Sequence, residues 1–345
     1  MRFFSILALG FLILQGCKKT NVTPDPPLPE PTIEIPQTVK ELIYKAYPTA
    51  GELKNARELE KDKVYEVSFR MGEKDYSVIS SQSNILQSSR MSGEEVPESV
   101  VERVQKLSIK GGVLSNYRTV TIANGGEADV ADYLLNGFKY VARFTPYAVY
   151  LNPFEKDYYT KNTADLPEGV QQFIAQRNKP NPTFINTLTN LNEASRNFII
   201  KNNELTFSDC RVLVMPDGTN AYEVSVNYFG TTHLTISFNA DSKVNWVASF
   251  NRLKKFEQDF NGTPALWAPN LTTQEISYFR DVLAGSSHFL GFNLDNFLNF
   301  ERSYRNEYED VKCYELQLNN NKNEFWYLRF SADKKLIYSF YNSNY

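Results

Sequence analysis

The stretch KVYEVSFRMG, residues 63–72, occurs in two further versions, AYEVSVNYFG at 221–230 and CYELQLNNNK at 313–322. In every version apolar and polar residues alternate after an opening tyrosine, which is the pattern of an antiparallel strand with one buried face. The three tyrosines are therefore expected to point into a core: Tyr65, Tyr222 and Tyr314. The glutamates that follow them are expected on the opposite face: Glu66, Glu223 and Glu315.

The similarity between the last two versions continues into the next strand. THLTISFNADSKV from Thr232 corresponds to EFWYLRFSADKKL from Glu324 without a gap. Ala-Asp-x-Lys between the apolar runs is turn chemistry, because an aspartate can hydrogen-bond the backbone two residues on and close a hairpin. A more diverged ladder is expected at 118–152. The spacing between the last two versions of the pattern, which begin at 221 and 313, is longer than the period of solenoid repeats. We therefore interpret the chain as duplicated subdomains.

Helix starts precede these ladders. Thr38-Val39-Lys40-Glu41 and Thr272-Thr273-Gln274-Glu275 fit a capping box, in which the threonine oxygen accepts an amide and the glutamate reaches back. Pro97 and Pro167 each precede a glutamate and suit the first position of a helix. Four helix starts thus alternate with four ladders. This order predicts an α+β fold of tandem units, each a helix plus an antiparallel β-sheet.

Residues 38 to about 110 resemble the PepSY-like, beta-lactamase-inhibitor-like family of secreted Bacteroidetes proteins. The matching motifs are Tyr47-Pro48-x-Ala50 at the end of the first helix, Tyr65-Glu66-Val67-x-Phe69 in the sheet and Pro97-x-x-Val100 at the next helix. The resemblance extends less fully to 221–250 and 313–340. It implies that each pair of helix-plus-sheet units forms one module with an exposed sheet. It also implies a binding protein, since some members of the family inhibit enzymes.

The N-terminus has the layout of a secretory signal. Met1-Arg2 supplies a positive charge, and the apolar run from Phe3 to Leu14 is too short to span a bilayer. Leu14-Gln15-Gly16-Cys17 resembles the lipobox of bacterial lipoproteins, which implies removal of residues 1–16 and acylation of Cys17. Two or three acyl chains give a stable membrane anchor. Because Lys18 follows the cysteine in place of aspartate, we expect the periplasmic side of the outer membrane.

The segment after Cys17 is rich in proline and predicts a semi-rigid tether over residues 17–37. The remaining chain is longer than one hydrophobic core usually serves. We therefore expect one module at 38–160 and a second at 161–345, with two helix-plus-sheet units in each.

Charge and motif content argue against several functions. The chain has 37 Lys and Arg against 40 Asp and Glu and no long basic block, so nucleic acid is not an expected partner. Its two histidines, His233 and His288, belong to no metalloprotease or hydrolase motif, and Ser287 beside His288 does not make a catalytic dyad. We expect no enzymatic activity, no cofactor and no metal site. The alternative of a glycosidase stays open, because its two catalytic carboxylates need only be close in space and have no fixed spacing in the sequence.

Two cysteines follow the lipobox, Cys210 and Cys313. In an oxidising periplasm they could form a disulfide. The alternative is a pair of separately buried thiols, and a mass shift on reduction distinguishes the two.

Aromatic side chains are the main indication of a binding surface. The candidates in FTPYAVYLNPFEKDYYT, residues 144–160, are Tyr147, Tyr150 and Phe154, and the candidates in the last ladder are Phe325, Tyr327 and Arg329. Interfaces favour tyrosine, phenylalanine and arginine. The same rings could instead cover the junction between modules, and Trp267 could plug a gap between helices or hold a sugar.

These observations lead to one expected function and one alternative. We expect a membrane-anchored envelope lipoprotein that acts as a non-catalytic binding module, with an envelope protein as its partner. The alternative is a glycan-binding or glycan-processing envelope protein, which the aromatic residues also suit.

The lipobox makes a prediction that can be tested without a partner. Cys17→Ser removes the acyl acceptor, so the variant is expected in the aqueous phase of a detergent partition while the parent chain enters the detergent phase. A variant that stays in the membrane fraction with its signal uncut would show that the apolar run itself is the anchor.

Overall fold

Helices and meandering strands alternate along the chain of the computed structural model, which describes residues 33–93, 95–122, 125–177, 206–228, 232–249, 271–286, 289, 292, 304–308, 311–320 and 322–344. These residues belong to one structural unit. Its first half contains α1 (Gln37–Ala46), β1 (Lys54–Glu60), β2 (Val64–Met71), β3 (Lys74–Ser81), β4 (Ile85–Met91), α2 (Glu98–Gln105), β5 (Val113–Ile122), β6 (Glu127–Leu135), β7 (Phe138–Phe144) and β8 (Ala148–Asn152). The remainder contains β9 (Lys156–Thr160), the 3-10 helix η1 (Thr163–Asp165), α3 (Glu168–Arg177), β10 (Thr206–Val214), β11 (Asn220–Tyr228), β12 (Thr232–Phe238), β13 (Val244–Ser249), α7 (Thr273–Ala284), β14 (Tyr304–Tyr308), β15 (Val311–Asn319), β16 (Glu324–Phe330) and β17 (Leu336–Asn344).

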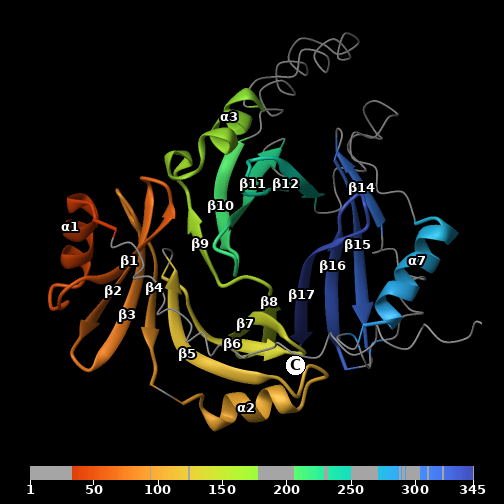
Figure 1. Ribbon diagram of the computed structural model, residues 1–345, viewed down its shortest axis with the longest axis horizontal. Helices are drawn as coiled ribbons and strands as arrows, with labels where there is room; N and C mark the ends of the chain where they lie inside the picture. Colours follow the sequence, from red (N-terminus) through yellow and green to blue (C-terminus); the bar gives the residue numbers. More distant parts are fainter. Residues whose placement is uncertain are drawn as a thin grey trace, which may run out of the picture. The chain divides into compact units, whose positions relative to one another are not determined.

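The strands form two antiparallel sheets, so the fold class is α+β as predicted (Figure 1). The larger sheet has 12 strands in the order β1-β2-β3-β4-β5-β6-β7-β8-β17-β16-β15-β14. The smaller sheet has five strands in the order β13-β12-β11-β10-β9. Strand β8 therefore pairs with the C-terminal strand β17, and β9 pairs with β10. Both pairings cross the boundary expected at residue 160, so the two expected modules do not form separate sheets.

The strands that contain the repeated pattern have the predicted buried face. Tyr65, Tyr222 and Tyr314 are 5%, 4% and 2% exposed. Tyr222 pairs with Phe238, and Tyr314 pairs with Phe330, so the second and third versions share one register with the strand that follows. The pairing that the sequence similarity indicated between these strands is thus the pairing that forms.

The helices cover these buried faces. Val39 and Ile43 of α1 pack against β2 and β3, and Phe279 and Leu283 of α7 share a core with Tyr314 and Trp326. Val104 of α2 joins that same core. In the smaller sheet, α3 packs through Val170 and Ile174 on Tyr222 and Ile236.

The helix starts lie where the sequence places them, but only one expected capping box forms. Thr272 caps α7 and accepts a hydrogen bond from the amide of Glu275, whose carboxylate accepts the Thr272 amide. At α1 the expected box is wrong, because the helix already begins at Gln37 after Pro36, which makes Thr38 a helical residue. Pro97 and Pro167 each lie directly before the first residue of α2 and α3, one position earlier than predicted.

The repeated glutamates lie on the predicted face but are not solvated. The side chains of Glu66, Glu223 and Glu315 are 14%, 11% and 15% exposed. Each forms an ion pair, with Lys156, Arg211 and Arg329 in that order. The sequence pattern could not show this because the cations come from other strands.

Removing a repeated tyrosine is expected to destabilise the chain. Tyr314→Ala deletes a ring that lies 5.1 Å from the Phe279 ring, between centroids, in the largest core. Such truncations cost about 3–5 kcal/mol, measured as the free energy of unfolding in denaturant. Tyr147→Ala is the matched control, because Tyr147 is 77% exposed, and is expected to be nearly neutral. A neutral Tyr314→Ala would contradict the side-chain register of β15.

Candidate functional site

The larger sheet has one face packed against α1, α2 and α7, and we call the opposite face the polar face (Figure 1). Side chains alternate along each strand, so the polar face carries the residues that flank the core positions. One cross-strand row runs from Arg118 on β5 through Val130, Arg143 and Tyr150 to Asn342 on β17. The polar face is therefore charged over β5 to β7 and aromatic over β8, β17 and β16.

The aromatic part is a row of four rings from three neighbouring strands: Tyr150, Phe340, Tyr327 and Phe325. The ring centroids of Tyr150 and Phe340 are 5.8 Å apart, those of Phe340 and Tyr327 are 6.0 Å apart, and both pairs are stacked. Phe325 meets Tyr327 edge-on at 5.3 Å. Tyr327 is 38% exposed and the other three rings are half-buried. We call these four residues the aromatic row.

The pairing of β8 with β17 assembles the aromatic row. Asn342 of β17 lies opposite Tyr150 on one side and opposite Phe325 on the other, while Phe340 lies opposite Tyr327. Side chains directly opposite one another on one face of a sheet have Cβ atoms about 5 Å apart, which places these rings in contact. The Oδ1 atom of Asn342 is buried among them and accepts no hydrogen bond in the structure.

Arg329 lies at one end of this region, and its charge is already compensated. Its Nε donates to the carboxylate of Glu315 over 2.8 Å, and its guanidinium lies 5.3 Å from the centroid of the Tyr338 ring. Burial by itself disfavours the charged guanidinium, but the Glu315 carboxylate outweighs it and raises the pKa of Arg329. Burial also raises the pKa of Tyr338 to about 12, and the nearby Glu223 carboxylate adds to that effect.

A second group of charges joins the polar face to the smaller sheet. Asp157 of β9, 5% exposed, accepts hydrogen bonds from Arg143 of β7 at 3.0 Å and from Arg211 of β10 at 2.8 Å. Arg211 also reaches Glu223 of β11 at 3.3 Å. Its guanidinium lies 4.9 Å from the centroid of the Phe154 ring. Charges this deeply placed need partners, and here each carboxylate has at least one cation.

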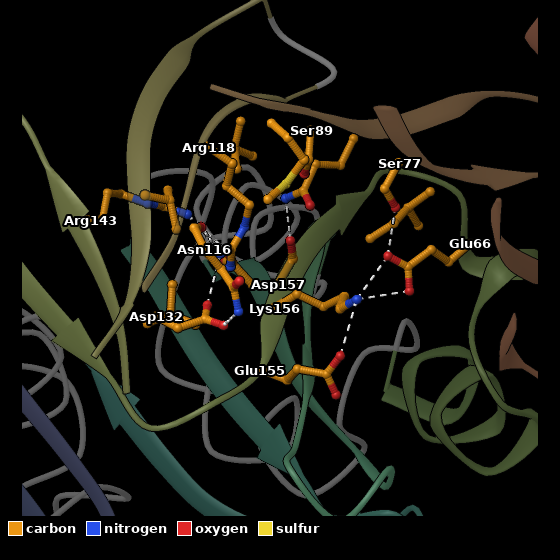
Figure 2. A pocket seen from close by; sticks show the side chains of 16 residues that line it. Glu66, Ser77, Ser89, Asn116, Arg118, Asp132, Arg143, Glu155, Lys156 and Asp157 are labelled. Atoms are coloured by element: carbon orange, nitrogen blue, oxygen red, sulfur yellow. Dashed lines mark hydrogen bonds and ion pairs between the residues drawn. The ribbon is translucent and has the colours of Figure 1, made fainter. Parts of the chain in front are cut away.

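A cavity of about 250 Å³ opens on the charged part of the polar face. Its apolar lining comes from Ile79, Val120, Val130 and Val141. Figure 2 shows two polar groups on different sides of it: Lys156 with Glu66 and Glu155, and Arg118 with Asp132 and Asn116. We call it the β5–β7 cavity.

The two polar groups of the β5–β7 cavity are internally paired. The Lys156 ammonium lies 2.8 Å from the Glu66 carboxylate and 3.1 Å from the Glu155 carboxylate. Arg118 donates to Asp132 at 2.8 Å. Burial alone favours the neutral form of Glu155, but Lys156 and Arg57 outweigh burial and hold the pKa of Glu155 below its ordinary value.

The structure brings together only some of the residues that the sequence analysis selected. Tyr150, Phe325 and Tyr327 meet in the aromatic row. Tyr147 lies in the turn before β8, and Phe154 does not belong to a binding face, because it is 2% exposed in a small core with Leu213. A ring that closes the contact between two sheets cannot also be offered to a partner.

Sequence reasoning missed Phe340 and the β5–β7 cavity. In LIYSFYNSN the buried residues are Ser339, Tyr341 and Ser343, which leaves Tyr338, Phe340 and Asn342 on the polar face. This alternation could have indicated that Phe340 points to the same side as Tyr327. It could not indicate Tyr150 as a neighbour, because that contact depends on which strand β17 pairs with.

The cysteine and histidine predictions are only partly covered by the described residues. Cys210 is a fully buried free thiol in the core beneath α3. The side chains of Cys313 and His233 lie outside the described residues, as do Cys17, Trp267, Ser287 and His288. Cys210 is free in the structure, and the choice between a Cys210–Cys313 disulfide and two separately buried thiols stays with the mass measurement.

The described residues contain neither a candidate metal site nor a candidate membrane-spanning helix. None of their His, Cys, Asp and Glu side chains form a group of three or more that could hold a metal ion. None of the described helices has the length and apolar character that crossing a membrane requires.

Comparisons with known proteins find likeness only at the level of solved structures. No protein-family model and no curated protein matches the chain. A DUF2874 family protein from Bacteroides uniformis is 22% identical, with 33% of this chain and 83% of that one covered at a TM-score of 0.28. A BLIP-like protein from Bacteroides fragilis is 17% identical, with 32% and 79% covered at a TM-score of 0.27. Likenesses at these identities and TM-scores leave the family of the chain a proposal.

The central carboxylate between the sheets is expected to be essential for stability. Asp157→Asn keeps the shape of the side chain but leaves Arg143 and Arg211 without their shared anion, which we expect to cost on the order of 3 kcal/mol in the free energy of unfolding. Asp333→Asn, at a turn where the Asp333 side chain is 59% exposed, is the control and should change little. Equal stability of the two variants would show that the ion pairs between the sheets are solvent-screened.

Proposed function

We propose that this chain is a non-catalytic binding protein of the cell envelope, which contacts its partner through the aromatic row. The observation that carries the proposal is the assembly of Tyr150, Phe340, Tyr327 and Phe325 on a sheet face that α1, α2 and α7 do not cover. Adjoining aromatic side chains that remain partly exposed are typical of interaction sites.

The surroundings of the aromatic row suit a stable interface. The row lies on regular strands whose opposite face is packed by Trp326, Leu328 and Tyr341, each fully buried. Rings held on rigid strands lose little conformational freedom when a partner binds, so more of the contact free energy appears as affinity. Tyrosine is also a frequent hot-spot residue.

The charged groups support binding over catalysis. Glu66, Asp132 and Asp157 each lie within 3.0 Å of a cationic nitrogen, so these carboxylates already serve as partners in ion pairs between strands.

The proposal includes the cellular address and the ancestry that the sequence indicates. An acylated Cys17 and the proline-rich tether would hold the folded part at the periplasmic side of the outer membrane. Among the described residues, α1, α2, α3 and α7 are each followed by a four-stranded meander, namely β1–β4, β5–β8, β10–β13 and β14–β17. This order and the shared register at Tyr222 and Tyr314 support an origin by tandem duplication of a PepSY-like, beta-lactamase-inhibitor-like unit.

One observation favours a glycan as the alternative ligand. The unpartnered Oδ1 of Asn342 lies amid the rings, and the amides of Gln317 and Asn319 lie on the neighbouring strand β15, 2.8 Å from each other. An aromatic platform with amide groups beside it can stack a sugar ring and hydrogen-bond its hydroxyls. We keep an envelope protein as the principal partner because the row spans several strands.

Replacing two rings of the row tests the proposal. Phe325→Ser with Tyr327→Ser should leave the melting curve nearly unchanged and abolish the capture of a specific envelope protein, identified by crosslinking in the native envelope and mass spectrometry. Phe138→Ser with Tyr147→Ser is the control, since these rings are 58% and 77% exposed and lie outside the row.

Each other outcome identifies a different error. Aromatic-dependent binding to a glycan array without protein capture would favour the alternative ligand. Unfolding of the Phe325/Tyr327 variant at ordinary temperature would show that the row is core. Retained capture in that variant would refute the row as the contact surface.

A further inference from the structure

The β5–β7 cavity is a second potential binding site, beside the aromatic row and independent of it. It is lined by side chains of β2 to β7 and β9, and its volume of about 250 Å³ would hold roughly eight water molecules. The aromatic row offers a broad and partly exposed surface, whereas this cavity has room only for a small molecule.

One side of the cavity presents guanidinium groups with unused donors. Arg118 and Arg143 both lie opposite Val130 in the cross-strand row, so they flank one apolar residue of the cavity lining. The Nε atom of Arg143 is buried and has no acceptor in the structure. Among the described residues, Arg118 donates through Nη1 alone, to the Asp132 carboxylate and to the backbone carbonyl of Asn116. A carboxylate between the two arginines would supply acceptors to these N–H groups.

The other side presents carboxylates. Glu66 and Glu155 both direct their carboxylates at Lys156, and in the view of Figure 2 these three residues lie on the other side of the cavity from Arg118. The Glu155 side chain is 38% exposed, more than Glu66 at 14%, and so is the more accessible of the two to an incoming cation. An ammonium group at this side would share the Glu155 carboxylate with Lys156 and Arg57.

Because the cavity lining contains both acidic and basic side chains, a ligand that carries both charges fits it better than a ligand with one charge. The lining includes the acids Glu66, Asp132, Glu155 and Asp157 and the bases Arg118, Arg143 and Lys156. A lone anion would meet four carboxylates, and a lone cation would meet three bases that already share those carboxylates. A ligand with both charges finds a complementary group at each end.

We propose that the β5–β7 cavity binds a small zwitterion, namely a free amino acid or a dipeptide. The ligand carboxylate lies between Arg118 and Arg143, its ammonium lies at Glu155, and its side chain covers Val120 and Val130. Because the cavity is lined by strands of both sheets, the ligand also ties β9 to the polar face.

The test uses the full-length chain in detergent and L-alanyl-L-alanine as the probe, with binding followed by calorimetry and by the shift of the melting temperature. We expect saturable binding that weakens at least tenfold when the probe is N-acetylated and at least tenfold when it is C-amidated. Equal binding of either blocked probe would overturn the zwitterion assignment, and no saturation by millimolar probe would overturn the site.

Two kinds of variant locate the binding. Arg118→Gln should abolish it, while Arg90→Gln, an exposed arginine on β4, should not. Ser89→Phe fills the cavity from β4 without removing a charge and should abolish binding while the unliganded melting temperature is kept. Unchanged affinity in Ser89→Phe would place the probe elsewhere and refute the proposal. The Phe325/Tyr327 variant should bind the probe normally, so a failure here is distinct from a failure of the aromatic row.

Discussion

The antiparallel pairing of β8 with β17 is the constraint on which the larger sheet depends. It joins eight strands from the N-terminal half to four strands from the C-terminus, through partners such as Tyr150 with Asn342 and Leu151 with Tyr341. A shift of one residue would turn every side chain of β17 to the other face. Tyr341, fully buried beside Trp326, would then leave the core, and Phe340 would leave the aromatic row. The core therefore fixes the register, and the register places the rings.

A second constraint acts on the polar face: a charged side chain that is removed from water needs an ion-pair or hydrogen-bond partner. The two sheets share the core beneath α3, which includes Val64 and Ile79 of the larger sheet. They also meet in a small apolar contact of Val120, Val141, Phe154 and Leu213, and the charges around it are largely enclosed. Asp157 compensates two of these charges, because its carboxylate accepts hydrogen bonds from both Arg143 and Arg211. Buried ion pairs often add little net stability, but one that loses a member is costly, so they act mainly to specify which sheets meet.

The proposed contact surface and the structural charges thus share one face of the larger sheet. Arg143 is a member of the ion pairs between the sheets, a wall of the β5–β7 cavity and the cross-strand neighbour of Tyr150. Helices α1, α2 and α7 stay on the opposite face, where they pack the apolar cores and hold the strands rigid. Preorganised rings and guanidinium groups lower the entropic cost of binding, which is the physical advantage of this division.

The sequence by itself determined the local features of the protein. Period-two alternation predicted the faces of β2, β11 and β15, the match between repeats predicted the pairing of Tyr222 with Phe238 and of Tyr314 with Phe330, and Thr272 with Glu275 marked the start of α7. These features depend on residues close in the chain or on adjacent strands of one meander. Only the tertiary structure decided that β17 pairs with β8 and β9 with β10, that Phe154 is core, and that the repeated glutamates are ion-paired and largely shielded from water. The physical reason is that these outcomes depend on contacts between distant segments, whose free energy comes from burial and charge pairing that no local pattern in the chain records.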